Sequence, residues 1–276
     1  MAGDIKTISL FEEYMKIVHV PTLEPEATND KSLYGKKLGL VNAATWIQLW
    51  TYYFGRLYLP GVKLVNVGNE AVQLNFMKAY RDGLECPPQR NIELFAGFSK
   101  DLIELADVDA IMITCSTMNR SFPYVQKAVQ EYGIPVIQID QPLMEAAVNR
   151  GGKTLVIATI GTTVASTRKL LEETASVMGK NKALSFTEAV VGEAFGFLGE
   201  GRIQDHNRVI AEKIKAVQKV EKIDQVILAQ LSMCVFNLSY PNPVREFGIP
   251  VLTSSTEGFK RAGEILRQLP GRSGNK

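Results

Sequence analysis

The chain has 276 residues, of which 46% are hydrophobic and 22% are charged, and its formal net charge is +2. This composition is typical of an ordinary globular protein with ample material for a buried core. Basic residues are scattered and do not alternate with aromatic ones, which argues against a nucleic-acid partner. The first thirty residues include acidic side chains and no long apolar run, so we expect no signal peptide, no membrane partner and a cytoplasmic location.

Cysteines and histidines are few and widely spaced. Cys86, Cys115 and Cys234 form no CxxC pair, and His19 and His206 lie far apart. We therefore expect reduced thiols, no metal site and no cofactor. Neither of the two glycine-rich phosphate-binding motifs occurs, which argues against a nucleotide-binding protein.

Short apolar runs alternate along the chain with segments of helical periodicity. The apolar runs are typical of buried parallel strands, and apolar residues at spacings of three and four are typical of helices packed on a sheet. In chain order the predicted strands are 37–42, 62–67, 110–114, 135–139, 155–158, 226–229 and 250–252. The predicted helices include 92–106, 123–132, 164–178 and 203–220. This alternation predicts the α/β class.

The second half of the chain repeats a pattern of the first half. Asp109 and Asp224 are 115 residues apart in similar apolar segments. The sequence Gly-Ile-Pro-Val recurs with the same offset at residues 133 and 248. We infer two copies of one unit, and therefore two pseudosymmetric parallel-sheet α/β lobes that face a central cleft. Residues 1–149 are expected to hold an N-terminal extension and the first lobe, and residues 150–276 the second lobe, whose C-terminal helix can cross back to the first.

Small polar side chains follow most of the predicted strands. Ligands of parallel α/β sheets bind beyond the carboxyl ends of the strands, where loops and helix N-termini offer N–H groups. A single hydroxyl there is an ordinary helix cap, whereas several together are suited to a small carboxylate. The segments concerned are Asn42, 114–117, 159–163, 230–232 and 253–256.

Cys115 is the reactive side chain among these strand ends. It follows a buried apolar run and precedes a predicted helix, and a thiol at a helix N-terminus has a pKa lowered from about 8.5 toward neutrality. A buried free cysteine can also be an inert small apolar residue. Cys86 and Cys234 lack the strand-end setting.

Residues 108–117, Val-Asp-Ala-Ile-Met-Ile-Thr-Cys-Ser-Thr, resemble the first cysteine motif of the aspartate/glutamate racemase superfamily. This superfamily includes hydantoin racemases, arylmalonate decarboxylases and maleate isomerases. Residues 157–166 resemble the threonine-rich start of its second lobe, and residues 243–252 resemble its closing helix and strand. The resemblance covers residues 36–270. It implies two α/β lobes, no pyridoxal phosphate or metal, and a carboxylic acid substrate between the lobes; we also expect a homodimer.

In racemising members of the superfamily, one thiolate removes the proton next to the carboxylate and a thiol of the other lobe returns a proton to the opposite face. By motif match, Cys115 occupies the first cysteine position. The second position holds Gln230, so we predict a single-thiol site with Cys115 and Gln230 as its catalytic residues. Cys234 is an alternative second thiol. The substrate-binding residues implied by the match are Asn42, Ser116, Thr117, Thr162, Thr163 and Ser232.

Several functions remain open at this point. A racemase or isomerase acts at the carbon next to a carboxylate through Cys115, whereas a decarboxylase-type lyase uses one thiol to protonate a carbanion from one face. Covalent attack by the thiol and a non-catalytic carboxylate-binding protein are further alternatives. Gln230 then binds substrate or stabilises an oxyanion. Five aromatic residues after the first strand either line a pocket or pack in the core or a dimer interface: Trp46, Trp50, Tyr52, Tyr53 and Phe54.

Overall fold

A computed structural model describes residues 7–18, 28–181 and 185–270. The elements of the first half are α1 (Thr7–Val18), β1 (Lys37–Asn42), η1 (Thr45–Ile47), α2 (Gln48–Tyr58), β2 (Lys63–Gly68), α3 (Glu70–Arg81), α4 (Gln89–Ala106), β3 (Ala110–Ile113), η2 (Ser116–Ser121), α5 (Phe122–Ala128), η3 (Gln130–Tyr132), β4 (Val136–Gln138) and α6 (Gln141–Arg150), where η marks a 3-10 helix. The elements of the second half are β5 (Lys153–Ala158), α7 (Gly161–Val177), β6 (Ser185–Val190), α8 (Gly192–Gly199), α9 (Ile203–Val220), β7 (Gln225–Leu228), η5 (Leu231–Val235), α10 (Phe236–Ser239), α11 (Pro243–Phe247), β8 (Val251–Thr253) and α12 (Ser254–Gln268). His19 lies outside the described residues.

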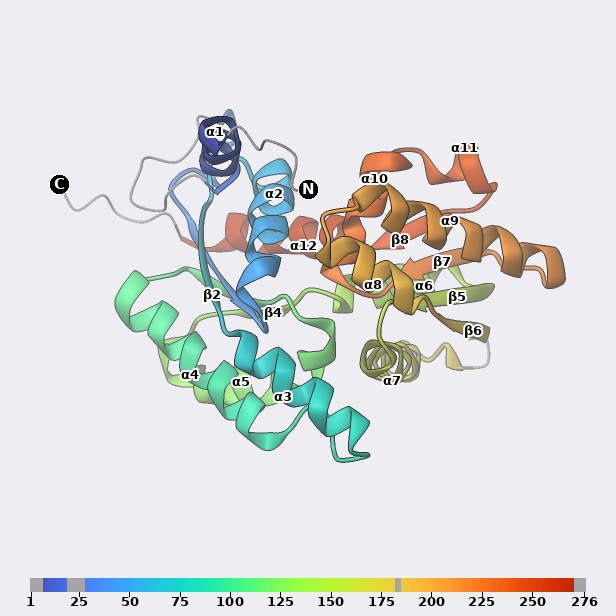
Figure 1. Ribbon diagram of the computed structural model, residues 1–276. Helices are drawn as coiled ribbons and strands as arrows, with labels where there is room; N and C mark the ends of the chain where they lie inside the picture. Colours follow the sequence, from blue (N-terminus) through green and yellow to red (C-terminus); the bar gives the residue numbers. More distant parts are fainter. Residues whose placement is uncertain (1–6, 19–27, 182–184, 271–276) are drawn as a thin grey trace.

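Two α/β lobes lie side by side (Figure 1). The described residues form one parallel four-stranded sheet in each lobe, with the strand orders β2-β1-β3-β4 and β6-β5-β7-β8. The two orders are equivalent, strand for strand. The predicted class, α/β with two pseudosymmetric parallel-sheet lobes, is therefore confirmed. No helix in the described part of the chain is both long and apolar enough to cross a membrane.

The repeated aspartates occupy equivalent places at the start of the third strand of each lobe. The Asp109 carboxylate accepts a hydrogen bond from the Lys37 backbone N–H at 2.7 Å, and the Asp109 N–H donates to the Lys37 carbonyl at 2.8 Å. Asp224 makes the same two contacts with Lys153, also at 2.7 and 2.8 Å. In each lobe the carboxylate ties the start of one strand to the start of its neighbour, which helps to set the register.

Burial explains which strands the sequence pattern predicts. The four residues of β3 are fully buried, and a strand covered on both faces is a continuous apolar run. The pattern does not predict β6, because this edge strand is exposed or half-buried along its length and mixes polar with apolar residues. The remaining predicted strands and helices agree with the observed elements to within a few residues.

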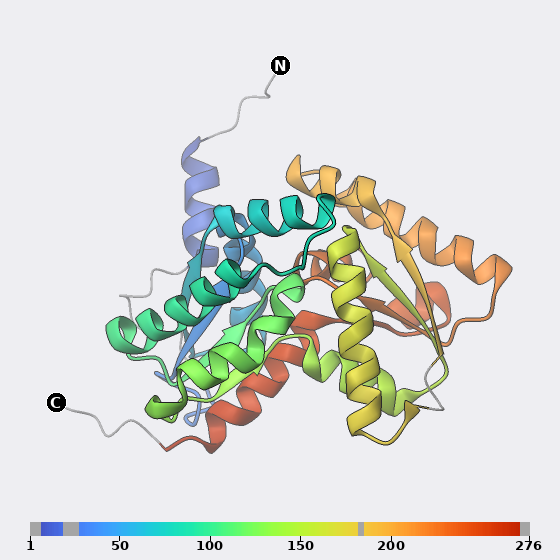
Figure 2. The same ribbon diagram turned by 90° about the horizontal axis from the view of Figure 1, so that it is seen from below.

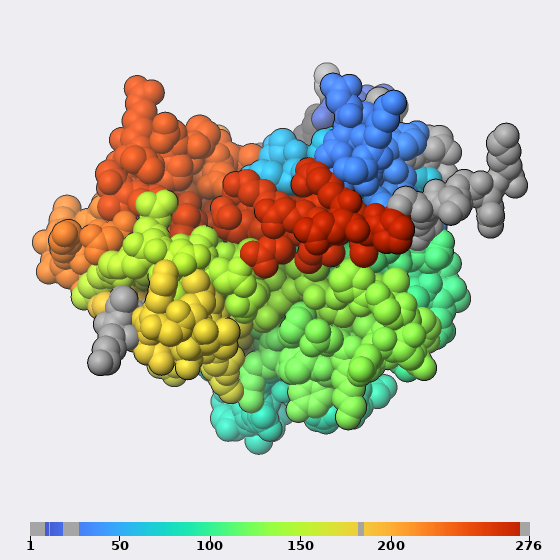
Figure 3. All heavy atoms as spheres, turned by 180° about the vertical axis from the view of Figure 1, so that it is seen from behind, coloured from blue at the N-terminus to red at the C-terminus, as the bar shows by residue number. Residues whose placement is uncertain are grey.

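The last helix joins the two lobes. α12 follows the final strand of the second lobe but packs against α2 and α6, and it lies across the back of the molecule between the lobes (Figures 2 and 3). Phe259 and Leu266 of α12 share one core cluster with Val235 of the second lobe and with the first-lobe sheet. Near the end of α12, Arg267 pairs with Asp30 at 2.9 Å. On this side the lobes have a common core.

Candidate active site

A small cavity of about 60 Å³ lies between the lobes, at the carboxyl ends of strands from both sheets. The first lobe contributes Ala43, Ala44, Trp46, Ile47, Gln73, Phe76, Thr114, Cys115, Ser116 and Thr117, and the second contributes Ile160, Thr163, Phe195, Gln230, Leu231 and Ser232. Ligand sites are usually larger, at roughly 300 Å³ or more. We call this arrangement closed, because the cavity is smaller than a substrate needs. Entry of a substrate would require the lobes or the side chains at the rim to move apart.

Most of the predicted site residues meet at this cavity. Those that line it are Cys115, Gln230, Ser116, Thr117, Thr163 and Ser232. Asn42 and Thr162 do not line it, although both contact residues that do.

Cys115 and Gln230 occupy equivalent positions in their lobes. Each residue directly precedes a 3-10 helix, η2 for Cys115 and η5 for Gln230, after the third strand of its sheet. Both backbones are extended at this point. Because the lobes face each other, these two equivalent side chains reach one cavity from opposite lobes.

Asn42 belongs to a buried network beneath the cavity. Its side-chain oxygen accepts a hydrogen bond from the Thr114 hydroxyl, and its amide donates to the Asn66 oxygen at 2.9 Å. The Thr51 hydroxyl donates to the same Asn66 oxygen at 2.7 Å. Asn42 thus holds Thr114, the residue between β3 and Cys115.

Hydroxyl groups connect the lobes beside Cys115. The Thr117 hydroxyl lies 3.1 Å from the Thr163 hydroxyl and 3.4 Å from that of Thr162. The Ser166 hydroxyl donates to the Ser116 carbonyl at 3.0 Å. In the closed arrangement Thr162 is therefore part of the contact between the lobes.

Burial dominates the acidity of Cys115. The thiol is surrounded by protein on most sides, and this desolvation raises its pKa to about 12. The backbone N–H groups of Met118 and Thr117 act in the opposite direction, and the negative charge of Asp140 adds to the increase. The expectation of a lowered pKa is wrong for this closed state, because two N–H groups of a short 3-10 helix do not compensate for the loss of water. At neutral pH the thiol is protonated and is a proton donor.

The raised pKa predicts how Cys115 reacts with iodoacetamide. Only the thiolate is alkylated, so the rate is expected to rise about tenfold per pH unit from pH 8 to pH 10 without levelling off. Mass spectrometry of the Cys115 peptide measures this rate. In the urea-unfolded chain the same cysteine should level off above about pH 9, since its pKa is then near 8.5. A plateau near pH 7 in the folded protein would contradict the raised pKa.

Gln230 is oriented by Thr159. The Gln230 side-chain oxygen accepts from the Thr159 backbone N–H at 2.6 Å and from the Thr159 hydroxyl at 2.7 Å. A backbone N–H can only donate, so this contact fixes which end of the amide is the oxygen. The amide nitrogen makes no hydrogen bond with the described residues, and Gln230 lines the cavity. Its two N–H groups are therefore available to a ligand.

Ser116 offers a second unused donor. Its hydroxyl is buried and has no hydrogen-bond partner among the described residues, although the residue lines the cavity. A buried polar group without a partner is costly, on the order of 1–3 kcal/mol. A ligand oxygen in the cavity would satisfy it.

Cys234 does not face the cavity. Its sulfur is fully buried in the core shared by the lobes and accepts a hydrogen bond from the Ser255 N–H at 3.3 Å. Burial raises the pKa of this thiol to about 11. Among the described lining residues Cys115 is the only thiol, so Cys234 is not a second acid in this arrangement.

Aromatic residues at the rim were not assigned to the site from the sequence. Trp46 of the first lobe and Phe195 of the second meet edge to face, with ring centroids 6.4 Å apart. The sequence does not decide whether Trp46 lines a pocket or packs in the core, and the glycine-flanked segment around Phe195 carries no pattern that predicts a site. The other four aromatic residues of that group pack in or against the core: Trp50, Tyr52, Tyr53 and Phe54.

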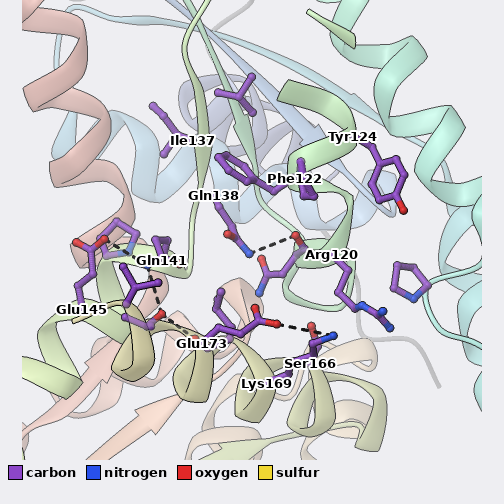
Figure 4. A pocket seen from close by; sticks show the side chains of 18 of the residues that line it. Arg120, Phe122, Tyr124, Ile137, Gln138, Gln141, Glu145, Ser166, Lys169 and Glu173 are labelled. Carbon is purple, nitrogen blue, oxygen red and sulfur yellow. Dashed lines mark hydrogen bonds and ion pairs between the residues drawn. The ribbon is translucent and has the colours of Figure 1, made fainter. Parts of the chain in front are cut away.

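A larger groove of about 830 Å³ lies between the lobes, lined by residues of α5, β4, α6, α7 and α12 (Figure 4). It contains no thiol among its described lining residues. Its charged side chains pair with one another, as Arg261 does with Glu145 at 2.7 Å and Lys169 with Glu173 at 3.7 Å. Nor do three His, Cys, Asp or Glu side chains gather anywhere in the described residues to hold a metal ion. We therefore take the smaller cavity as the candidate active site.

Solved structures of known proteins share this architecture. Glutamate racemase from Francisella tularensis subsp. tularensis SCHU S4, in complex with D-glutamate, superposes with a TM-score of 0.62 at 17% identity, over 87% of this chain and 85% of that chain. An aspartate racemase homologue from Pyrococcus horikoshii OT3 gives 0.61 at 19% identity, over 84% and 100%. Allantoin racemase from Klebsiella pneumoniae gives 0.58 at 16% identity, over 87% and 97%. At these identities the likeness concerns the fold.

Family membership follows from the sequence itself. No curated protein sequence matches the chain. The family model described as Asp/Glu/Hydantoin racemase matches residues 72–262, which is most of the chain and includes both Cys115 and Gln230. The resemblance seen in the cysteine motif is thereby confirmed, and the chain belongs to the Asp/Glu/Hydantoin racemase family, as an enzyme of the racemase and isomerase type.

Proposed function

We propose that this enzyme moves a proton at the carbon next to a carboxylate, with the Cys115 sulfur as its acid and base and without a cofactor. The observation that carries the proposal is the meeting of Cys115 and Gln230, from equivalent strand ends of the two lobes, in one closed cavity. Family membership supports the reaction class.

The unused donors define how the carboxylate is held. The Ser116 hydroxyl and the Gln230 amide N–H groups donate to its oxygens. In its thiolate form, which the raised pKa makes the minor one, Cys115 removes the proton from the neighbouring carbon. The C–H electron pair then moves onto the carboxylate and forms an enediolate. Hydrogen bonds from the same donors become stronger as negative charge grows on these oxygens, which lowers the barrier to proton removal. Return of the proton from the thiol to carbon restores the acid and the thiolate.

The single thiol restricts the stereochemistry. Among the described lining residues no second thiol faces Cys115, and the Gln230 amide does not exchange protons at neutral pH as a thiol does. Proton exchange should therefore take place on one face of the substrate, with retention of configuration. Racemisation then depends on proton delivery to the other face by water, and is slow.

One observation favours a second candidate, a decarboxylase-type lyase. The raised pKa keeps Cys115 protonated in the closed state, which suits a proton donor better than a base. In this reaction the carbon–carbon bond of a malonate-type acid breaks and carbon dioxide leaves. The electron pair stays on the substrate as an enediolate, and the Cys115 proton is transferred to carbon. Solvent then reprotonates the thiolate.

Uptake of solvent deuterium tests the proposal. Both enantiomers of a panel of amino acids and other 2-substituted carboxylic acids are incubated with enzyme in D2O, and loss of the α-hydrogen signal is followed by proton NMR. We expect exchange of at least one acid, faster than any racemisation. Carbon dioxide release from 2-substituted malonates without such exchange would favour the lyase. Binding of an acid with neither reaction would leave a carboxylate-binding protein and contradict both candidates.

A further inference from the structure

We infer that the site selects a carboxylic acid whose reacting carbon carries an uncharged, apolar group, and that it discriminates against dicarboxylic acids such as aspartate and glutamate. This inference concerns the same cavity and rests on the proposed function. It names the substrate class, which the reaction type alone leaves open.

The first observation is the absence of a cation at the cavity. None of the described lining residues is Lys, Arg or His, and Cys115 is the only ionisable side chain among them. The nearby carboxylate of Asp140 is buried, held by hydrogen bonds from Asn119 and Ser254, and its charge acts on Cys115. A second substrate carboxylate enclosed here would have no cation to pair with, and an unpaired buried charge is strongly unfavourable.

The second observation is the kind of free donor. The side-chain donors without a partner among the described lining residues are all uncharged: the Ser116 and Ser232 hydroxyls and the amide nitrogens of Gln73 and Gln230. The other lining hydroxyls have partners, since that of Thr114 contacts the Asn42 side-chain oxygen and the Val41 carbonyl, and those of Thr117 and Thr163 contact each other. Such neutral donors are suited to the two oxygens of one carboxylate. None of them supplies the positive charge that would pair with a second carboxylate.

The third observation is the apolar wall. Trp46, Ile47 and Phe76 line the cavity from the first lobe, and Ile160, Phe195 and Leu231 line it from the second. The Trp46 indole N–H already donates to Gln73 at 3.0 Å, so the ring offers apolar surface. Contact with this wall stabilises an apolar substituent by about 25 cal/mol per Å² of surface buried.

Two sets of acids of nearly constant shape test this selectivity. Leucine, asparagine and aspartate differ mainly in the polarity and charge of the side chain, and 4-methylpentanoate, succinamate and succinate repeat the comparison without the amino group. Binding is measured as protection of Cys115 from alkylation, with the partly exposed Cys86, outside the cavity, as internal control. In at least one set the leucine-shaped acid should half-protect at a concentration about a hundredfold lower than the aspartate-shaped acid, in line with the cost of an unpaired buried charge.

A variant pair shows whether charge is the cause. Phe195→Arg places a cation at the rim and should lower the half-protecting concentration of the aspartate-shaped acid at least about tenfold. Gly196→Arg is the matched control, because it adds the same charge one residue away, outside the cavity, where an added Cβ meets no atom within 4 Å. It should leave the order of the acids unchanged.

Equal or better protection by the aspartate-shaped acid in wild-type protein would overturn the inference, as would the absence of protection by every acid in both sets. Two other outcomes distinguish a failure of this inference from a failure of the proposed function. If aspartate binds best and exchanges its α-hydrogen through Cys115, the reaction stands and the substrate class is wrong. If leucine-shaped acids bind best but Cys115→Ser exchanges them as fast as wild type, the substrate class stands and the mechanism is wrong.

Discussion

Cys115→Ser is expected to lower α-hydrogen exchange by about 10²–10⁴-fold, the usual contribution of a positioned acid or base. Serine is nearly isosteric with cysteine, and Cys115 is partly exposed at the cavity, so the free energy of unfolding should change by less than about 1 kcal/mol. The serine hydroxyl accepts and returns protons far less readily than a thiol, which is why activity and stability should separate. Proton NMR in D2O and urea unfolding measure the two quantities.

Cys86→Ser is the matched control for this experiment. Cys86 is also a partly exposed free thiol, but it does not line the cavity. Exchange should continue at the wild-type rate in this variant. If Cys115→Ser kept the wild-type rate as well, no thiol chemistry at this cavity could account for the reaction.

The fold was accessible from the sequence because buried parallel strands must be continuous apolar runs. β1, β3, β5 and β7 are the inner strands of their sheets, and each was predicted from such a run. The repeated Asp109 and Asp224 identified the duplication because each ties the same two strands together. β6 lies at the edge of its sheet, where a continuous apolar run is not required, so the sequence pattern does not predict it.

Only part of the candidate site could be predicted from the sequence. Ser116 and Gln230 lie within three residues of the ends of β3 and β7, so strand position and duplication bring them to one cavity. Phe195 reaches the cavity from a helix, and its position depends on how the second lobe packs against the first. The predicted lowering of the Cys115 pKa was wrong for a related reason: the sequence indicates the neighbouring N–H groups, but not the burial that outweighs them.

Gln230→Cys is expected to convert one-sided exchange into racemisation. The substitution places a thiol at the second-lobe position equivalent to Cys115, in the same cavity. A second acid on the opposite face can then protonate the enediolate while Cys115 holds the removed proton, and a positioned acid contributes on the order of a hundredfold or more. Chiral chromatography of the product, with deuterium incorporation measured in each enantiomer, follows the change.

Gln230→Ser is the control that separates the new thiol from the lost amide. Both variants remove the amide donor and leave the Thr159 N–H without its side-chain acceptor, and the two side chains have nearly the same size. Racemisation should therefore be about a hundredfold faster in Gln230→Cys than in Gln230→Ser, while both lose part of the stabilisation of the enediolate. Wild-type racemisation at ordinary enzyme rates, with solvent deuterium in both enantiomers, would show that another group already delivers protons to the opposite face. In that case the cavity must open into an arrangement in which a second acid reaches the substrate, because Cys234 is enclosed in the core of the closed form.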